Sequence, residues 1–160
     1  MTRVAVIADT HLPRGARVLP PLCVELLRGA DLILHGGDFV SVAFLDELRA
    51  LGPPVEAVYG NMDEPGLKES LPKQHVVEVE GARIGMVHIP GPAAGRAARL
   101  RAKFPDCDAV IYGHVPEIVQ DERVWILNPG SPTETRRAPG YSMLVLDVVA
   151  QEIRPKLVAL

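Results

Sequence analysis

Short apolar runs alternate with amphipathic segments along the first half of the chain. The first run covers residues 3–8 without a break, which is typical of a strand buried on both faces in a parallel α/β sheet. Two further runs, over residues 31–35 and 55–59, predict two more strands. Amphipathic stretches predict helices over residues 22–28 and 42–51. This order of strand, helix and strand favours right-handed parallel βαβ units.

The second half has a pattern of paired strands. Runs over residues 75–80 and 83–89, separated by Gly81 and Ala82, predict a β-hairpin. The other predicted elements are a helix, two strands and a closing hairpin, over residues 93–104, 109–112, 124–127, and 141–149 with 152–158. Together the two halves predict an α/β fold in a single domain, residues 1–160.

Composition narrows the class of protein. The 160 residues are 48% hydrophobic, which is enough for a packed core without disulfides, and the net charge of −3 argues against an extensive nucleic-acid surface. No apolar run approaches the length of a membrane span, and no signal peptide opens the chain, so we expect a cytoplasmic protein without membrane contact. Cys23 and Cys107 have no metal-site spacing and are interpreted as small buried hydrophobic residues.

Polar side chains follow the predicted strands where each strand ends. Asp9 and His11 come directly after the first strand, and in an extended segment side chains two positions apart point the same way, so both could reach one ion. Carboxylate, amide and imidazole groups without a thiolate suit Mn²⁺, Fe, Ni²⁺ or Zn²⁺. The strand ends that follow carry further groups of this kind: Gly37-Asp38, Gly60-Asn61, His88 and Gly113-His114.

Taken in order, these motifs resemble the calcineurin-like metallophosphoesterases, and among them the small prokaryotic YfcE-like phosphodiesterases. The likeness covers nearly the whole chain, and residues 128–131, Asn-Pro-Gly-Ser, extend it. The resemblance implies a four-layer α/β/β/α sandwich with two divalent metal ions at the strand ends. It also implies a metal-dependent phosphodiesterase in which a water held between the ions attacks phosphorus.

The resemblance assigns roles to individual residues. It implies that Asp9 and His11 hold the first ion and that Asp38 bridges both ions. It implies that the second ion is held by Asn61, His88 and His114. The catalytic residues expected on this basis are Asp9, Asp38, Asn61, His88 and His114.

The chain departs from the family pattern at two positions. Pro116 stands where the family usually has a second histidine, two positions after His114, so the first ion loses a ligand and should bind more weakly. Glu117 or an ordered water is a conceivable substitute. Met62 stands where larger phosphatases carry a histidine that protonates the leaving group, and the YfcE-like branch also lacks that histidine.

Other polar residues leave two interpretations open. Arg14 and Arg17 follow His11 and are predicted to bind the phosphate of a small phosphodiester or nucleotide-like substrate, although solvated loop charges would need no such role. Arg136 and Arg137 are open to the same two readings. His35 is either a brace for the metal ligands or a buried, hydrogen-bonded core residue. Asn128 and Ser131 either brace the site or simply form a turn.

A second class of function also fits the sequence. The resemblance extends to a eukaryotic retromer subunit that serves mainly in assembly, so a degenerate, weakly active protein-interaction scaffold is the alternative. The retained Asp9, Asp38, Asn61, His88 and His114 favour the enzyme. The sequence leaves self-association into a homo-oligomer open.

Overall fold

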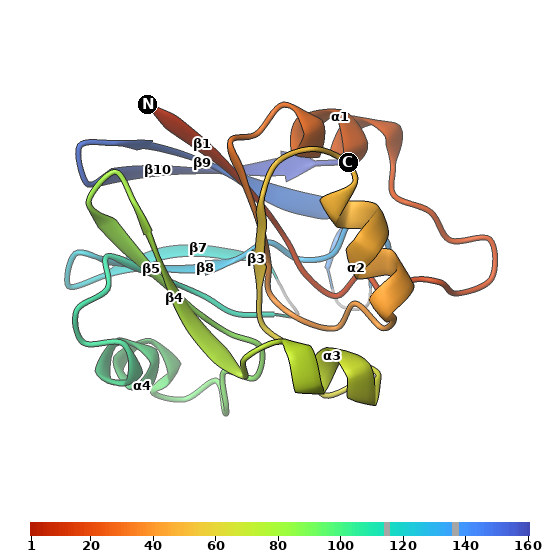
Figure 1. Cartoon of the computed structure of the whole chain (residues 1–160). Helices are drawn as coiled ribbons and strands as arrows, with labels where there is room; N and C mark the ends of the chain where they lie inside the picture. Colours follow the sequence, from red (N-terminus) through yellow and green to blue (C-terminus); the bar gives the residue numbers. More distant parts are fainter. Residues whose placement is uncertain (114–115, 136–137) are drawn as a thin grey trace.

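Two five-stranded sheets lie face to face in the computed structural model, which describes residues 1–113, 116–135 and 138–160 (Figure 1). The first sheet has the strand order β10-β9-β1-β2-β3. Its strands are β1 (Thr2–Ile7), β2 (Leu32–His35), β3 (Val55–Ala57), β9 (Ser142–Val149) and β10 (Glu152–Ala159). β1, β2 and β3 run parallel, as predicted, and β9 pairs antiparallel with β1.

The second sheet has the strand order β4-β5-β6-β8-β7. Its strands are β4 (Gln74–Val79), β5 (Ala82–Val87), β6 (Ala109–Ile111), β7 (Glu117–Asp121) and β8 (Val124–Asn128). β5, β6 and β8 run parallel, and the outer strands β4 and β7 are antiparallel to their neighbours. The predicted hairpins β4–β5 and β9–β10 are both present.

Helices cover the outer faces of both sheets and complete the predicted four-layer α/β/β/α sandwich (Figure 1). They are α1 (Pro21–Arg28), α2 (Val42–Arg49), α3 (Pro65–Ser70) and α4 (Arg96–Lys103). α1, α2 and α3 pack on the first sheet, and Leu100 of α4 packs on Val110 and Ile126 of the second. In β1, Val4 faces the second sheet while Ala5 faces the helices, so this strand is buried on both faces, as its unbroken apolar run predicts.

The structure contains two elements that the sequence pattern does not indicate, and its boundaries differ at several ends. α3 places one side chain, Leu67, in the core and therefore has no amphipathic period. β7 is a largely exposed edge strand joined to β8 by Glu122 and Arg123, which both have positive φ without the Asn or Gly usual in such a turn. The predicted strand over residues 55–59 ends at Ala57, and the helix over 93–104 begins at Arg96.

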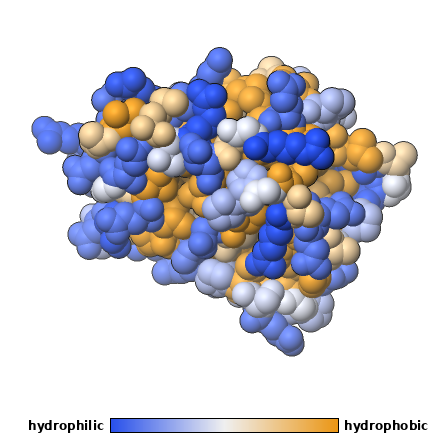
Figure 2. Space-filling model, turned by 45° about the horizontal axis from the view of Figure 1, so that its top comes forward, coloured by the Kyte–Doolittle hydropathy of each residue, from blue (hydrophilic) through white to orange (hydrophobic). Residues whose placement is uncertain are grey.

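The described helices have at most 8 residues, which is too short to cross a membrane. On the face drawn in Figure 2, hydrophilic and hydrophobic residues are interspersed, so the hydrophobic surface there is divided among small areas.

Both cysteines are buried and unpaired with each other, as predicted, and burial raises the pKa of the Cys23 thiol to about 12.

Candidate metal centre

Four side chains from three strand ends meet at one edge of the sandwich. Asp9 and His11 follow β1, Asp38 follows β2, and His88 directly follows β5. His11 Nε2 lies 3.7 Å from Asp9 Oδ1 and 3.7 Å from Asp38 Oδ2. His88 Nε2 lies 3.8 Å from Asp9 Oδ1 and 3.1 Å from Asp38 Oδ2. All four side chains are buried, and Asp9, His11 and Asp38 could hold one metal ion.

The backbone conformation that brings Asp9 and His11 together differs from the predicted one. β1 ends at Ile7, and Asp9 (φ 54°) and His11 (φ 47°) both have left-handed backbone, so the prediction of an extended segment is wrong. Hydrogen bonds support this conformation, because the Asp9 amide donates to the carbonyl of Gly37 (2.9 Å) and the His11 amide to that of Asp38 (3.1 Å). These bonds join the loops after β1 and β2 and turn their side chains toward one point.

The orientation of His88 suits a cation. A carbonyl oxygen only accepts, so His88 Nδ1 donates to Gly36 O at 2.8 Å. In the neutral imidazole, Nε2 then directs a lone pair at Asp38 Oδ2, 3.1 Å away. Two acceptors at this distance repel each other unless a proton or a metal ion lies between them. Neutral imidazole and carboxylate are common ligands of divalent transition metals, so the donor set fits such an ion.

The same contact changes both pKa values. Burial by itself would raise the pKa of Asp38, but the hydrogen bond from His88 and the amide of Met62, 2.9 Å from Asp38 Oδ1, outweigh it and lower the pKa to about 2. Burial by itself would lower the pKa of His88, but Asp38 and Asp9 raise it. Binding of a divalent ion at this point would therefore release a proton.

Two glycines allow the loops to approach this closely. A Cβ at Gly60 would overlap the Asp38 carboxylate and lie 2.5 Å from the Asp38 backbone nitrogen. A Cβ at Gly113 would lie 2.7 Å from His88 Nδ1 and 2.9 Å from Asp9 Oδ2. Both positions therefore require glycine for steric reasons, which explains the glycines that precede Asn61 and His114 in the sequence.

Asp63 is a functional residue that the sequence analysis missed. Its buried Oδ2 accepts from the backbone amides of Gly60 (2.7 Å) and Asp38 (3.1 Å). Burial raises the pKa of Asp63, although these amides oppose the shift. The carboxylate thus holds the loop after β3 against the loop that carries Asp38. An acidic residue three positions after a turn glycine was the available signal.

Replacing Asp63 should test this bracing role. Asp63→Ala leaves two buried amides without their acceptor, which should lower the free energy of unfolding by roughly 2–6 kcal/mol at ~1–3 kcal/mol for each amide. Asp63→Asn keeps a carbonyl acceptor and should cost less than half as much. Urea unfolding measures both, with the exposed Asp106→Ala as a control expected within about 0.5 kcal/mol of the original protein. Equal stability of Asp63→Ala and the control would contradict the bracing role.

His35 braces the loop after β1 from inside the core. Its Nδ1 accepts from the Gly37 amide (3.0 Å), so its Nε2 donates to Thr10 Oγ1 (3.0 Å), and its ring stacks on Phe39. Burial lowers the pKa of His35 well below its usual value, so the ring is neutral. The interpretation of His35 as a buried, hydrogen-bonded residue is confirmed, and its two partners, Gly37 and Thr10, are neighbours of the candidate metal ligands.

The loop after β8 is attached to the same segment. Ser131 Oγ donates to the Asp9 carbonyl (2.7 Å), and Thr133 Oγ1 donates to the Thr10 carbonyl (2.7 Å). Asn128 Oδ1 accepts from the Gly130 amide at 2.9 Å and forms the turn itself. Ser131 therefore braces the site, and Asn128 shapes the turn that positions Ser131.

The remaining predicted site residues lie around this cluster. The Asn61 side chain is exposed and lines a hollow that His88 also lines. Arg14 and Arg17 lie beside His11, where both pair with the carboxylate of Glu134 at 3.3 and 2.8 Å. Three predicted residues lie outside the part of the chain that the structure describes: His114, Arg136 and Arg137.

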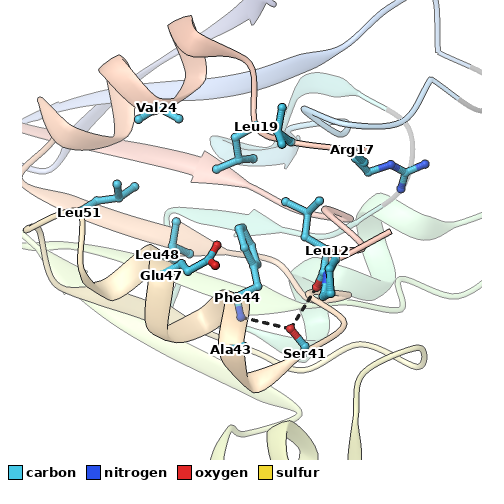
Figure 3. Close-up of a pocket in the computed structure, with 12 residues that line it drawn as sticks. Leu12, Arg17, Leu19, Val24, Ser41, Ala43, Phe44, Glu47, Leu48 and Leu51 are labelled. Carbon is cyan, nitrogen blue, oxygen red and sulfur yellow. Dashed lines mark hydrogen bonds between the residues drawn. The ribbon is translucent and has the colours of Figure 1, made fainter. Parts of the chain in front are cut away.

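The surface hollows alone do not identify the candidate metal site. An apolar hollow of about 440 Å³ lies between α1 and α2, and Phe44 and Leu48 line it with Leu12 (Figure 3). Ser41 Oγ donates to the Leu12 carbonyl and accepts from the Phe44 amide, which attaches the start of α2 to the loop after His11 (Figure 3). The four clustered donor residues are not among the residues that line this hollow. The donor atoms, and not the apolar hollow, therefore define the candidate site.

The two-sheet sandwich and the buried carboxylate and imidazole cluster define a fold with a candidate divalent-metal site. A model of the calcineurin-like phosphoesterase superfamily domain matches residues 2–151, and the chain belongs to this superfamily. The likeness to metallophosphoesterases seen in the sequence is thereby confirmed.

Relatives and solved structures agree with this membership. A probable metallophosphoesterase of Methanothermobacter thermautotrophicus is 35% identical over 159 residues, 97% of this chain and 91% of that protein. A phosphodiesterase of Methanocaldococcus jannaschii is 26% identical over 143 residues, 80% of this chain and 82% of that protein. The crystal structure of Vps29 from Entamoeba histolytica, complexed with Zn²⁺, has a TM-score of 0.76 and 25% identity and covers 98% of each chain.

Proposed function

We propose that this protein hydrolyses small phosphodiesters with the help of two divalent metal ions, in the cytoplasm. The observation that carries the proposal is the convergence of His11 and His88 on the carboxylates of Asp9 and Asp38, at 3.1–3.8 Å between donor atoms. Buried carboxylates and imidazoles this closely spaced form a favourable donor set for a divalent cation. Membership of the superfamily and the phosphodiesterase relative support the proposal.

The ligands divide between two ions. In this proposal Asp9 and His11 hold the first ion, Asp38 bridges both, and the second takes Asn61 and His88 together with His114. When bound, the ions supply an activated water and the positive charge that the reacting phosphate needs. The protein fixes the ligands beforehand, because Gly36 O orients His88 and the Met62 amide holds Asp38 Oδ1.

The substrate is proposed to lie beside Arg14 and Arg17. Both line a hollow of about 440 Å³ with Thr133, Glu134 and Tyr141, next to His11. Its volume suits a small molecule, and guanidinium groups pair well with phosphate oxygens. A small phosphodiester or a nucleotide-like ester therefore fits both the size and the charge of this surface.

A metal-dependence assay tests the function. Protein stripped with a chelator should not cleave bis(p-nitrophenyl) phosphate, and added Mn²⁺ should restore cleavage together with two bound ions per chain. His75→Ala is a matched control, because His75 pairs with Glu56 on the surface, away from those proposed ligands that the structure describes. Cleavage that survives chelation would rule out the metal-dependent mechanism.

The same assay separates the enzyme from the alternative, a protein-interaction scaffold. The similarity to Vps29, which was crystallised with Zn²⁺, is the observation that favours the scaffold. For the scaffold we expect little or no cleavage of aryl phosphoesters, even at metal concentrations that fill the site.

A further inference from the structure

We propose that Glu134 is a ligand of the first metal ion and takes the place of the imidazole that the family has where this chain has Pro116. This inference rests on the two-ion site of the proposed function. It adds a residue that the sequence analysis did not consider, and it changes the expected strength of the first site.

One distance places the Glu134 carboxylate within ligand range of His11. Its Oε2 lies 3.9 Å from His11 Nε2, close to the 3.7 Å that separates His11 Nε2 from the Asp9 and Asp38 oxygens. Metal–ligand bonds of about 2.0–2.2 Å place two donors of one ion roughly 3–4.4 Å apart. The Glu134 side chain is 9% exposed, so its carboxylate is largely shielded from solvent.

The backbone of Glu134 is fixed to the loop that carries the other ligands of this ion. Ser131 Oγ accepts from the Glu134 amide (3.0 Å) and donates to the Asp9 carbonyl (2.7 Å). Thr133, the residue before Glu134, donates its hydroxyl to the Thr10 carbonyl (2.7 Å). The carboxylate is therefore held beside Asp9 and His11 by two separate attachments.

The two oxygens of Glu134 face different groups. Oε1 pairs with Arg17 (2.8 Å) and Arg14 (3.3 Å), whereas Oε2 faces His11. One carboxylate can thus contact the arginines and an ion at the same time. The arginines then act as positioning residues that orient the ligand, as hydrogen-bonding partners of metal ligands commonly do.

Glu117, the substitute that the sequence suggested, is engaged elsewhere. Its Oε1 accepts from the Tyr112 hydroxyl at 2.9 Å, and burial together with this contact raises the pKa of Tyr112 to about 12. Of the two acidic side chains, Glu134 is the one that reaches His11. Glu117 therefore serves as a matched control.

Calorimetric titration of the full, chelator-stripped chain with Mn²⁺ tests the proposal without any activity measurement. The original protein should bind two ions. Glu134→Gln keeps the shape but loses the charge, and should weaken one ion at least tenfold while the other keeps its affinity. Glu134→Asp keeps the charge but shortens the reach, and should weaken the same ion. Glu117→Gln should bind both ions like the original protein.

Co²⁺ spectra distinguish a ligand from a nearby charge. If Glu134 coordinates the first ion, Glu134→Gln saturated with two Co²⁺ should show changed ligand-field bands, whereas loss of a remote charge would leave them unchanged. Unchanged bands, or Mn²⁺ affinities equal to those of the original protein, would overturn the role of Glu134 and leave the proposed function standing. An original protein that binds no ion would overturn both, and one that binds a single ion would overturn the Glu134 proposal.

Discussion

Asp38→Asn should remove both metal ions and reduce the rate of phosphodiester cleavage about a thousandfold or more, while the fold persists. In the proposed site the Asp38 carboxylate would supply charge to both ions, and several kcal/mol of lost stabilisation correspond to that factor at about 1.4 kcal/mol per tenfold. The fold should survive because an asparagine carbonyl can still accept from the Met62 amide, and its amino group can donate to His88 Nε2.

The effect of Asp38→Asn is interpreted by comparing it with the effect of Asp9→Asn. Asp9 is assigned to the first ion alone, so its replacement should weaken that ion and spare the other. Metal content after dialysis and kcat/KM with bis(p-nitrophenyl) phosphate measure the two effects, and circular dichroism checks the fold. If the two variants lost the same number of ions, the assignment of Asp38 as the bridge would be wrong.

The sequence predicts most of the fold because burial imposes its own pattern on the chain. The run in β1 must be apolar at every position, since Val4 faces the other sheet and Ala5 faces the helices. α3 and β7 lack such a pattern, because one anchors through Leu67 alone and the other lies exposed at a sheet edge. Elements with little buried surface leave little trace in the order of apolar and polar residues.

The cluster of candidate metal ligands is predictable for a similar reason, but the contacts that support these ligands are not. The carboxyl ends of parallel strands meet at one edge, so Asp9 and Asp38 were expected to approach each other. The contact of Asp63 with the Asp38 amide depends on how the loop after β3 packs on the loop after β2, and the contact of Glu134 with His11 depends on the left-handed backbone at His11 and on the course of the loop after β8. Both contacts join residues far apart in the sequence, so no spacing along one strand encodes them.

The second large effect concerns the leaving group, and it depends on Met62. The Met62 amide donates to Asp38 Oδ1, so the start of this side chain is fixed beside the bridging carboxylate, while the side chain itself is exposed. A thioether cannot donate a proton to a departing oxygen. Turnover should therefore depend steeply on the stability of the leaving anion, and aryl esters should be cleaved far faster than alkyl esters.

The charge of the site adds a preference for diesters. A monoester dianion carries one more negative charge than a diester, and Glu134 on the first ion would bring a further negative charge where the family has a neutral imidazole. We therefore expect kcat/KM for bis(p-nitrophenyl) phosphate to exceed that for p-nitrophenyl phosphate, at every Mn²⁺ concentration that supports activity. Faster cleavage of the monoester by the original protein would contradict the assignment as a diesterase.

Met62→His should move this preference toward monoesters. An imidazole at this position begins next to the bridging carboxylate and can protonate the leaving oxygen, a contribution of typically 10²–10⁴-fold that matters most for poor leaving groups. Met62→Leu is the matched control, because it changes shape without adding a proton donor. The measurement is kcat/KM for aryl and alkyl esters, each as monoester and as diester, on all three proteins across a pH series. If the missing proton donor sets the substrate class, the gain should be confined to Met62→His and should be larger for alkyl than for aryl esters. It should also disappear as the imidazole loses its proton. Equal gains in both variants would instead trace the effect to shape.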